Sequence, residues 1–346
     1  MAKKHDIQFE KKNIIVTGGA GFLGSHLCDL LVKTDRVICV DNFSTGLEIN
    51  IHHLLKNPDF EFLKHDMTEP LDVLQYEELK KFDIQTQGIQ EIYHLASPTS
   101  PKYYHANPVE TLLANSLGTR NALDLARKHE ARIVFFSSAA IYGEPREATP
   151  FPEQYWGYTD PVGPRSAYIE GKRFAESLIT NYRRVYALEA KIMRVFNTYG
   201  SRMQLDDGRM IPDFVRNAMA GKPVTIYGTK DDMVSMVYVS DVLEAAMRLM
   251  ASHEHGPVNV GNPEQITVGE IAKKIITLLG SPSTIRYSPH LPYTVKQGIP
   301  SIHRAKEKLG WFPVVSYDEG LKRTVDALRG SNTIEFNSEY YQENES

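Results

Sequence analysis

Cysteine is scarce in this chain, which contains only Cys28 and Cys39 among its 346 residues. Two cysteines cannot form the disulfide framework of a small secreted domain. Both lie among apolar neighbours, so we interpret them as buried packing residues. Their scarcity fits a reducing compartment, and we expect the protein to be cytoplasmic.

An excess of positive charge is also absent, because 39 Lys and Arg face 43 Asp and Glu, a net charge of -4. No global positive field attracts nucleic acid or anionic lipid, and we expect neither partner. The chain has no apolar run of about 18 residues, the length that a membrane-spanning helix needs. Residues 1–10 also lack the apolar stretch of a signal peptide. Any anionic ligand must therefore be held by local groups.

Histidines with metal-ligand spacing are lacking as well. His52 and His53 are adjacent, and His253 and His255 lie close together, but no second pair of cysteines or carboxylates accompanies either set. We expect no metal site. Trp156 and Trp311 are interpreted as packing residues, with Trp156 as a candidate neighbour of a bound sugar.

The first part of the chain alternates short β-branched runs with longer helical patterns, which predicts βαβ units and a parallel sheet. The runs are apolar without alternation, as expected when helices cover both faces of a sheet. We therefore predict an α/β fold with a Rossmann-type, doubly wound parallel sheet of six strands. These strands are expected at 14–17, 37–40, 60–63, 91–95, 133–137 and 190–195, with helices at 25–33, 111–129 and 166–188.

The alternation of strands and helices becomes less regular after Asn197, where Gly and Pro residues separate shorter predicted elements. A length of 346 residues corresponds to about two domains. We place a cofactor-binding domain at 1–197 and a smaller substrate-binding domain at 198–330, with 151–164 contributing to the cleft between them. The segment 331–346 reads as a polar tail.

The long helices predicted at 111–129 and 166–188 carry apolar residues on more than one side. This pattern fits a homodimer or a higher homo-oligomer formed through these helices. It fits equally well with helices that are buried in the core.

The strongest motif is the glycine-rich stretch 17–24, which follows the first predicted strand and opens the first helix. Gly18 permits a tight turn, Gly21 lets the backbone approach a pyrophosphate, and Gly24 allows close helix packing. Asp41 ends the second strand, where a carboxylate accepts hydrogen bonds from an adenosine ribose and repels a 2′-phosphate. The sequence therefore predicts NAD as the cofactor.

A second set of residues predicts hydride-transfer chemistry. Tyr168 and Lys172 lie four residues apart and thus on one helix face. A tyrosine becomes a base near neutral pH only when a cation stabilises its phenolate, and Lys172 and an oxidised nicotinamide are the candidates for that charge. Ser138 ends a strand at the ligand side of the sheet and can hydrogen-bond the same substrate oxygen. We predict Ser138, Tyr168 and Lys172 as the catalytic residues.

Together these motifs resemble the extended short-chain dehydrogenase/reductase superfamily, whose members act on nucleotide-diphosphate sugars. The stretches 41–46, 65–66, 94–101, 155–157, 161–172 and 194–200 look like its UDP-glucuronate decarboxylase branch, and the similarity spans roughly 14–328. The resemblance implies a cofactor site that contains Gly18, Gly21, Phe22, Leu23, Gly24, Asp41, Asn42, Ser44, Thr45, Gly46, Asp66, Met67, Leu95, Ala96, Ser97, Tyr168 and Lys172. It implies a substrate site that contains Ser97, Pro98, Ser138, Tyr168, Asn197 and Arg209.

Three departures from that branch bear on the reaction. Where decarboxylases carry a Ser-Glu pair and 4,6-dehydratases an Asp-Glu pair, this chain has Ala139 and Ala140. Val234 stands where the family has an arginine that grips the pyrophosphate. The arginine usually found before the Pro-Asp-Ile element has no counterpart around 295–302. Lys230, Arg209 and Lys296 remain as candidates for the phosphate grip.

The sequence thus predicts an enzyme that oxidises the C4 hydroxyl of a nucleotide-diphosphate sugar with tightly bound NAD, as a C4 epimerase or 4-dehydrogenase. Overall similarity favours a UDP-glucuronate decarboxylase that makes UDP-xylose, whereas Ala140 and Val234 argue against it. The third alternative is a non-catalytic NAD(H)-binding protein, which would have no use for Ser138, Tyr168 and Lys172 together.

Overall fold

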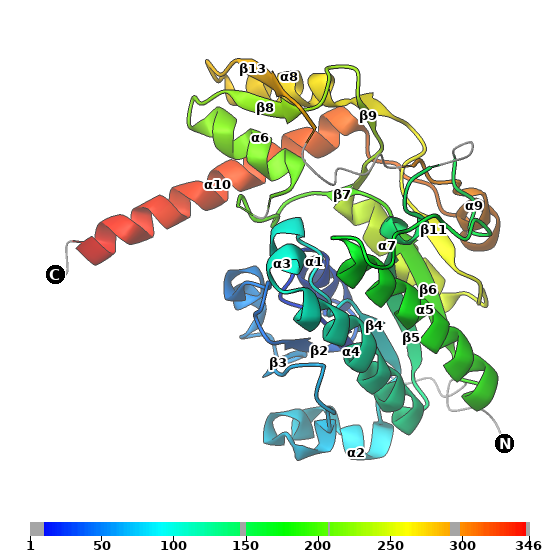
Figure 1. The fold of residues 1–346 in the computed structure, drawn as a ribbon. Helices are drawn as coiled ribbons and strands as arrows, with labels where there is room; N and C mark the ends of the chain where they lie inside the picture. Colours follow the sequence, from blue (N-terminus) through cyan, green and yellow to red (C-terminus); the bar gives the residue numbers. More distant parts are fainter. Residues whose placement is uncertain (1–9, 146–149, 207, 291–297, 344–346) are drawn as a thin grey trace.

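The computed structural model describes residues 10–145, 150–206, 208–290 and 298–343, with side chains described to residue 330 (Figure 1). The charged N-terminal segment 1–9, Lys296 and the side chains of the predicted tail lie outside the described residues.

A seven-stranded parallel sheet forms the centre of the molecule, in the order β11-β6-β5-β4-β1-β2-β3. Its strands are β1 (Asn13–Thr17), β2 (Arg36–Asp41), β3 (Phe60–Lys64), β4 (Glu91–His94), β5 (Arg132–Ser138), β6 (Ala190–Val195) and β11 (Val258–Val260). The six strands predicted from the sequence are all present, and the Rossmann-type fold is confirmed. The seventh strand, β11, was not predicted.

Helices cover both faces of this sheet (Figure 1). Ile14 and Val16 of β1 belong to a core that includes residues of α1 (Phe22–Leu31) and α7 (Val239–Ala251). Ile15 belongs to a separate core with residues of α4 (Pro108–His129) and α5 (Ser166–Tyr186). Because successive side chains of a strand point to opposite faces, each of the strands β1 to β6 contributes to both cores, which explains their continuous apolar sequences.

Three short strand pairs and the helices α6, α8 and α10 follow β6 and lie beyond the carboxyl ends of the strands (Figure 1). The strand pairs are β7–β10, β9–β12 and β8–β13, and α6, α8 and α10 pack together beside them. The bounds are β7 (Thr198–Tyr199), α6 (Met210–Met219), β8 (Val224–Tyr227), β9 (Met233–Val234), β10 (Val237–Tyr238), β12 (Ile266–Thr267), α8 (Val268–Leu279), β13 (Ile285–Ser288), α9 (His303–Leu309) and α10 (Tyr317–Glu343). Two short helices earlier in the chain are α2 (Ile84–Gln87) and α3 (Pro101–Ala106).

The chain after residue 197 returns to the central sheet before it finishes. β11 pairs with β6, and α7 packs against β5 and β6. Some elements after residue 197 therefore pack on the central sheet, so the predicted boundary does not divide the molecule in space as it divides the sequence. The division into two domains stays a prediction.

The α4–α5 face of the molecule exposes several apolar side chains, and the two helices pack side by side (Figure 1). The exposed apolar side chains are Val109, Leu112, Leu113 and Leu117 on α4, and Phe174 and Val185 on α5. Ile169 and Ile179 of α5 are buried. The helices are therefore buried in the core on one side and leave apolar residues exposed on another, and the oligomer stays a prediction. Within the described ranges, no helix has the length and apolar character needed to cross a membrane.

Candidate active site

A cavity of about 1500 Å³ lies at the carboxyl ends of the strands, between the central sheet and the shorter elements. Its wall contains every predicted site residue except Gly46. Gly46 lies behind Asp41: a Cβ atom on it would be only 2.9 Å from a carboxylate oxygen of Asp41. It supports the wall and does not form it.

The glycine-rich loop has the conformation that its sequence predicts. Gly18 has φ of +71°, and its N–H donates to the carbonyl of Val40 at 2.7 Å. A Cβ atom on Gly18 would lie 2.9 Å from the backbone nitrogen of Ala96. On Gly24 it would lie 2.1 Å from the carbonyl oxygen of Gly18, so any larger residue disrupts the turn. The loop leads into α1 through Gly21, which directs the helix N-terminus toward the cavity.

Asp41 is held rigidly at the end of β2. Its carboxylate accepts hydrogen bonds from the backbone N–H of Ala20 at 2.9 Å and of Phe43 at 2.8 Å. Burial raises the pKa of Asp41, and these backbone bonds oppose the rise. Nearby, Asn42 donates to the carboxylate of Asp66 at 2.9 Å. The pKa of Asp66 is lowered overall, because hydrogen bonds from Thr68 and Asn42 outweigh burial.

These residues fit a dinucleotide. The cradle of Gly18, Gly21 and Gly24 leaves backbone space that a Cβ would fill, the N-terminus of α1 faces it, and Asp41 places a carboxylate at the cavity wall. Their roles in binding stay predictions.

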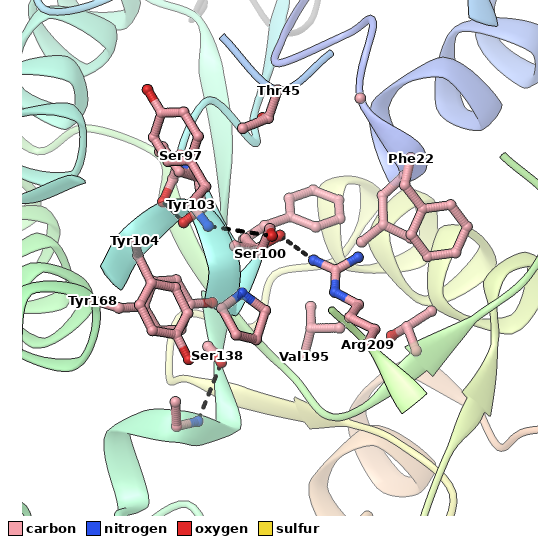
Figure 2. Close-up of a pocket in the computed structure, with 18 of the residues that line it drawn as sticks. Phe22, Thr45, Ser97, Ser100, Tyr103, Tyr104, Ser138, Tyr168, Val195 and Arg209 are labelled. Atoms are coloured by element: carbon pink, nitrogen blue, oxygen red, sulfur yellow. Dashed lines mark hydrogen bonds between the residues drawn. The ribbon is translucent and has the colours of Figure 1, made fainter. Parts of the chain in front are cut away.

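Ser138, Tyr168 and Lys172 all line the cavity and lie close together, as the sequence predicts. Figure 2 shows Ser138 beside Tyr168. Ser138 ends β5 and caps the 3₁₀ turn η6 (Ala139–Tyr142), with its hydroxyl accepting from the N–H of Ala140 at 3.1 Å. A hydrogen bond joins the Ser138 hydroxyl to the Tyr168 phenol. The Nζ of Lys172 donates to the carbonyl of Phe136 at 2.8 Å and lies 6.0 Å from the centre of the Tyr168 ring.

The electrostatic setting of Tyr168 is mixed. Burial raises the pKa of Tyr168, while the bond with Ser138 and the charges of Arg209 and Arg165 oppose that rise. Burial lowers the pKa of Lys172 to about 7, and the Glu176 carboxylate opposes this effect. Near neutral pH, Lys172 is therefore balanced between its charged and neutral forms. A phenol beside such groups is suited to exchange a proton with a bound alcohol.

Two neighbours of Tyr168 were not predicted from the sequence. Tyr104 of α3 stacks on it, with ring centres 5.2 Å apart and planes within 10° (Figure 2). Arg165 precedes α5 and lines the cavity. No motif marks Tyr104, because its contact with Tyr168 joins α3 to α5. Arg165 is three residues before Tyr168, and this spacing was the available signal.

Arg209 enters the cavity from the segment before α6 and donates to the hydroxyl of Thr99 at 2.6 Å (Figure 2). It is the one predicted phosphate-binding candidate found in the cavity wall of the described chain, since Lys230 does not line the cavity and Lys296 lies outside the described residues. Asn197 also lines the wall and donates to the carbonyl of Ser235 at 3.3 Å.

The wall formed by β9 differs from what the resemblance implies. Val234 lines it, next to Asp232, whose carboxylate is 3.4 Å from the imidazole of His290. The expected guanidinium is replaced by an apolar side chain with an acid nearby. A valine cannot supply the charge-assisted contact to an anion that the resemblance implies at this wall.

The two tryptophans have different environments. Trp311 is buried as predicted, and its ring N–H donates to the carbonyl of Asp241 at 2.9 Å. The prediction for Trp156 was wrong: its side chain is 89% exposed and does not line the cavity. Arg173 binds the carbonyl of Trp156 at 2.8 Å, so the loop is held by its backbone while the indole points to solvent.

Residues 14–266 match the model of the NAD dependent epimerase/dehydratase family. UDP-glucuronic acid decarboxylase 1 of Danio rerio is 40% identical over 332 residues, which cover 96% of this chain and 76% of that protein.

Two solved structures share the fold. UDP-glucose 4-epimerase of Thermotoga maritima with UDP-glucose is 29% identical with a TM-score of 0.81, covering 92% of this chain and 99% of the other. UDP-glucuronic acid 4-epimerase of Bacillus cereus, in complex with UDP-glucuronic acid and NAD, is 25% identical with a TM-score of 0.77 and the same coverage.

Proposed function

The chain belongs to the NAD dependent epimerase/dehydratase family and is an NAD-dependent enzyme of that kind, and we propose that it oxidises the C4 hydroxyl of a nucleotide-diphosphate sugar, as a C4 epimerase or 4-dehydrogenase. The observation that carries this proposal is the meeting of Ser138, Tyr168 and Lys172 in the wall of the cavity.

In the proposed reaction each residue has a distinct task. The Ser138 hydroxyl hydrogen-bonds the reacting sugar oxygen and holds it beside Tyr168. The Tyr168 phenolate accepts the hydroxyl proton, and the Lys172 ammonium stabilises that phenolate. Bound NAD supplies the acceptor for the hydride. The stacked ring of Tyr104 keeps Tyr168 in place and excludes water from one of its faces.

The side chains after Ser138 favour chemistry confined to C4. Elimination of water across C5 and C6 needs a proton acceptor and a donor near those carbons. Ala139 and Ala140 line the cavity and provide neither. Returning the hydride to C4 needs no further acid, and neither does release of the 4-keto product.

Decarboxylation of UDP-glucuronate is the second candidate function, and the names of the relatives favour it. A 4-keto intermediate is itself the electron sink for loss of carbon dioxide, so the chemistry requires few additional groups. Ala140 and Val234 oppose this candidate, because both positions differ from the branch pattern.

The two outcomes are separated by product analysis. Purified protein is incubated with UDP-glucuronate, and carbon dioxide and UDP-xylose are followed alongside UDP-galacturonate and NADH absorbance. We expect the 4-epimer or a retained NADH signal without carbon dioxide. Stoichiometric release of carbon dioxide with UDP-xylose would overturn the C4-only proposal in favour of decarboxylation.

A panel of UDP-, GDP- and dTDP-sugars then identifies the substrate by the same readouts. Tyr168→Phe is the matched control, because it removes the proton acceptor and keeps the ring that stacks on Tyr104. Absence of turnover of every sugar in the panel by the unaltered protein, and hence no difference from Tyr168→Phe, would support the non-catalytic NAD(H)-binding alternative.

A further inference from the structure

A buried ion pair lies directly behind the catalytic cluster. Glu176 of α5 binds Arg194 of β6 through two guanidinium nitrogens, at 2.7 Å from Nη2 and 3.0 Å from Nε. The same carboxylate accepts from the hydroxyl of Ser137 at 2.6 Å. Both charged side chains are about nine-tenths buried. None of these three residues has a role in the proposed reaction.

The ion pair is in register with the catalytic residues. Tyr168, Lys172 and Glu176 occur every fourth residue of α5 and therefore form one row along the helix. Three consecutive residues of β5 bind this row: Phe136 through its carbonyl to Lys172, Ser137 to Glu176, and Ser138 to Tyr168. A shift of β5 against α5 would change all three contacts together.

The network also reaches the other side of Ser138. Arg194 donates from Nη1 to the phenol oxygen of Tyr142 and to the carbonyl of Glu153, each at 2.8 Å. Tyr142 closes the η6 turn that Ser138 opens, and it donates to Asn259 of β11 at 2.7 Å. Ser138 is thus braced through Ser137 on one side and through η6 on the other.

We propose that Glu176 is a positioning residue, which through Ser137 and Arg194 fixes the end of β5 against α5 and so sets the distance between Ser138, Tyr168 and Lys172. This inference rests on the proposed function. The geometry requires a side chain that accepts from both partners at once, and a carboxylate with two oxygens does so.

Charge adds a second effect of Glu176. The groups that face Lys172 are Tyr168 and Glu176 on its own helix and His94 on β4. His94 stays neutral, because burial and the nearby Lys172 lower its pKa to about 3. Glu176 is therefore the negative charge that helps Lys172 to keep its proton, and its loss lowers the pKa of Lys172.

The test compares Glu176→Gln with Glu91→Gln in the full-length protein with NAD present. Glu91 is a matched control, because it is also buried and also binds an arginine, Arg132, at 2.6 Å. It lies at the opposite, amino end of the sheet, far along β4 from the cavity. Folding of each variant is followed by thermal unfolding, and activity is expressed per folded molecule.

We expect Glu176→Gln to lower kcat by about 10- to 100-fold with little change in KM, because misplacement of reacting groups acts on the chemical step. The alkaline limb of its pH–activity profile moves to lower pH, because Lys172 loses its proton more readily. Glu91→Gln leaves kcat and the profile unchanged. Equal effects of both variants, or an unchanged profile in Glu176→Gln, would overturn the proposal.

Ser137→Ala covers the case in which Glu176→Gln fails to fold. This variant removes the hydrogen bond from Ser137 to Glu176 and keeps the ion pair of Glu176 with Arg194. We expect a smaller loss in kcat and an unchanged pH–activity profile. Unchanged kcat in Ser137→Ala would contradict the bracing of β5. If Tyr168→Phe retains activity, the proposed function itself fails, whereas loss in Tyr168→Phe with no loss in Glu176→Gln refutes only the positioning role.

Discussion

Two lysines are almost completely buried, and they differ in how their ammonium groups are satisfied. Lys191 donates to three carbonyls at the carboxyl end of α7, those of Leu249, Met250 and Ser252. Lys172 donates to one carbonyl, that of Phe136, and otherwise faces the Phe135 ring and the cavity. One ammonium is fully used in the structure, and the other has donors free to bind within the site.

The difference shows that burial of a lysine does not by itself indicate a role in the active site. Burial lowers the pKa of Lys191 to about 8 and that of Lys172 to about 7. The shifts are similar, but only Lys172 shares a cavity wall with Ser138 and Tyr168. A perturbed pKa indicates an active site when it coincides with reacting groups in a cavity.

The largest expected effect is on activity. Lys172→Met removes the cation beside Tyr168, and we expect kcat/KM to fall by about 10²- to 10⁴-fold, the usual range for loss of acid–base catalysis. Lys191→Met, measured per folded molecule with the same sugar substrate, should keep full activity. A comparable loss in both variants would mean that the contrast between the two lysines is structural and not catalytic.

Stability should show the opposite order. Lys191→Met removes the lysine donor from three carbonyls at the end of α7, of which only that of Leu249 also accepts from Ser252, and we expect the free energy of unfolding to fall by about 1–3 kcal/mol. Lys172→Met loses a single hydrogen bond and no longer buries a charge, so its change should be smaller. Urea unfolding of the two variants at neutral pH measures both values. A larger loss in Lys172→Met would reverse this interpretation.

The smallest effect, within any one pH unit, is the slope of stability with pH. The pKa of both lysines is lower in the folded protein than the usual 10.5, so between about pH 8 and 10 the unfolded chain binds more protons. The free energy of unfolding therefore rises with pH there, by up to about 1.4 kcal/mol per pH unit for each lysine.

Urea unfolding from pH 7 to 9.5 tests this slope. Lys172→Met should remove the part that begins near pH 7, and Lys191→Met the part that begins near pH 8. An unchanged slope in either variant would show that the lysine concerned keeps an ordinary pKa in the folded protein.

The fold and much of the candidate site were predictable from local patterns. Apolar runs bounded by turns identify β1 to β6, because strands covered by helices on both faces have no polar side. The glycine-rich loop and Asp41 were recognisable because turn, helix start and acid follow in fixed order along the chain. Tyr168 and Lys172 share a helix, so their spacing alone brings them together.

Other features could not be found in this way. β11 is three residues long and joins the sheet from more than 60 residues after β6, so no local signal assigns it. No local sequence signal indicates that Glu176 and Arg194 pair, and only packing buries them. Trp156 was predicted to be buried because its side chain is large and apolar, whereas its loop is held through the backbone carbonyl that Arg173 binds.

The sequence by itself determined the layered α/β architecture, the turn that fits a dinucleotide and the placing of Tyr168 and Lys172 on one helix face, since each depends on residues near one another or on periodicity. Only the tertiary structure decided that Tyr104 stacks on Tyr168, that Arg209 enters the same cavity, and that Glu176 braces β5. These contacts join segments distant along the chain, and their formation depends on how the helices and strands pack.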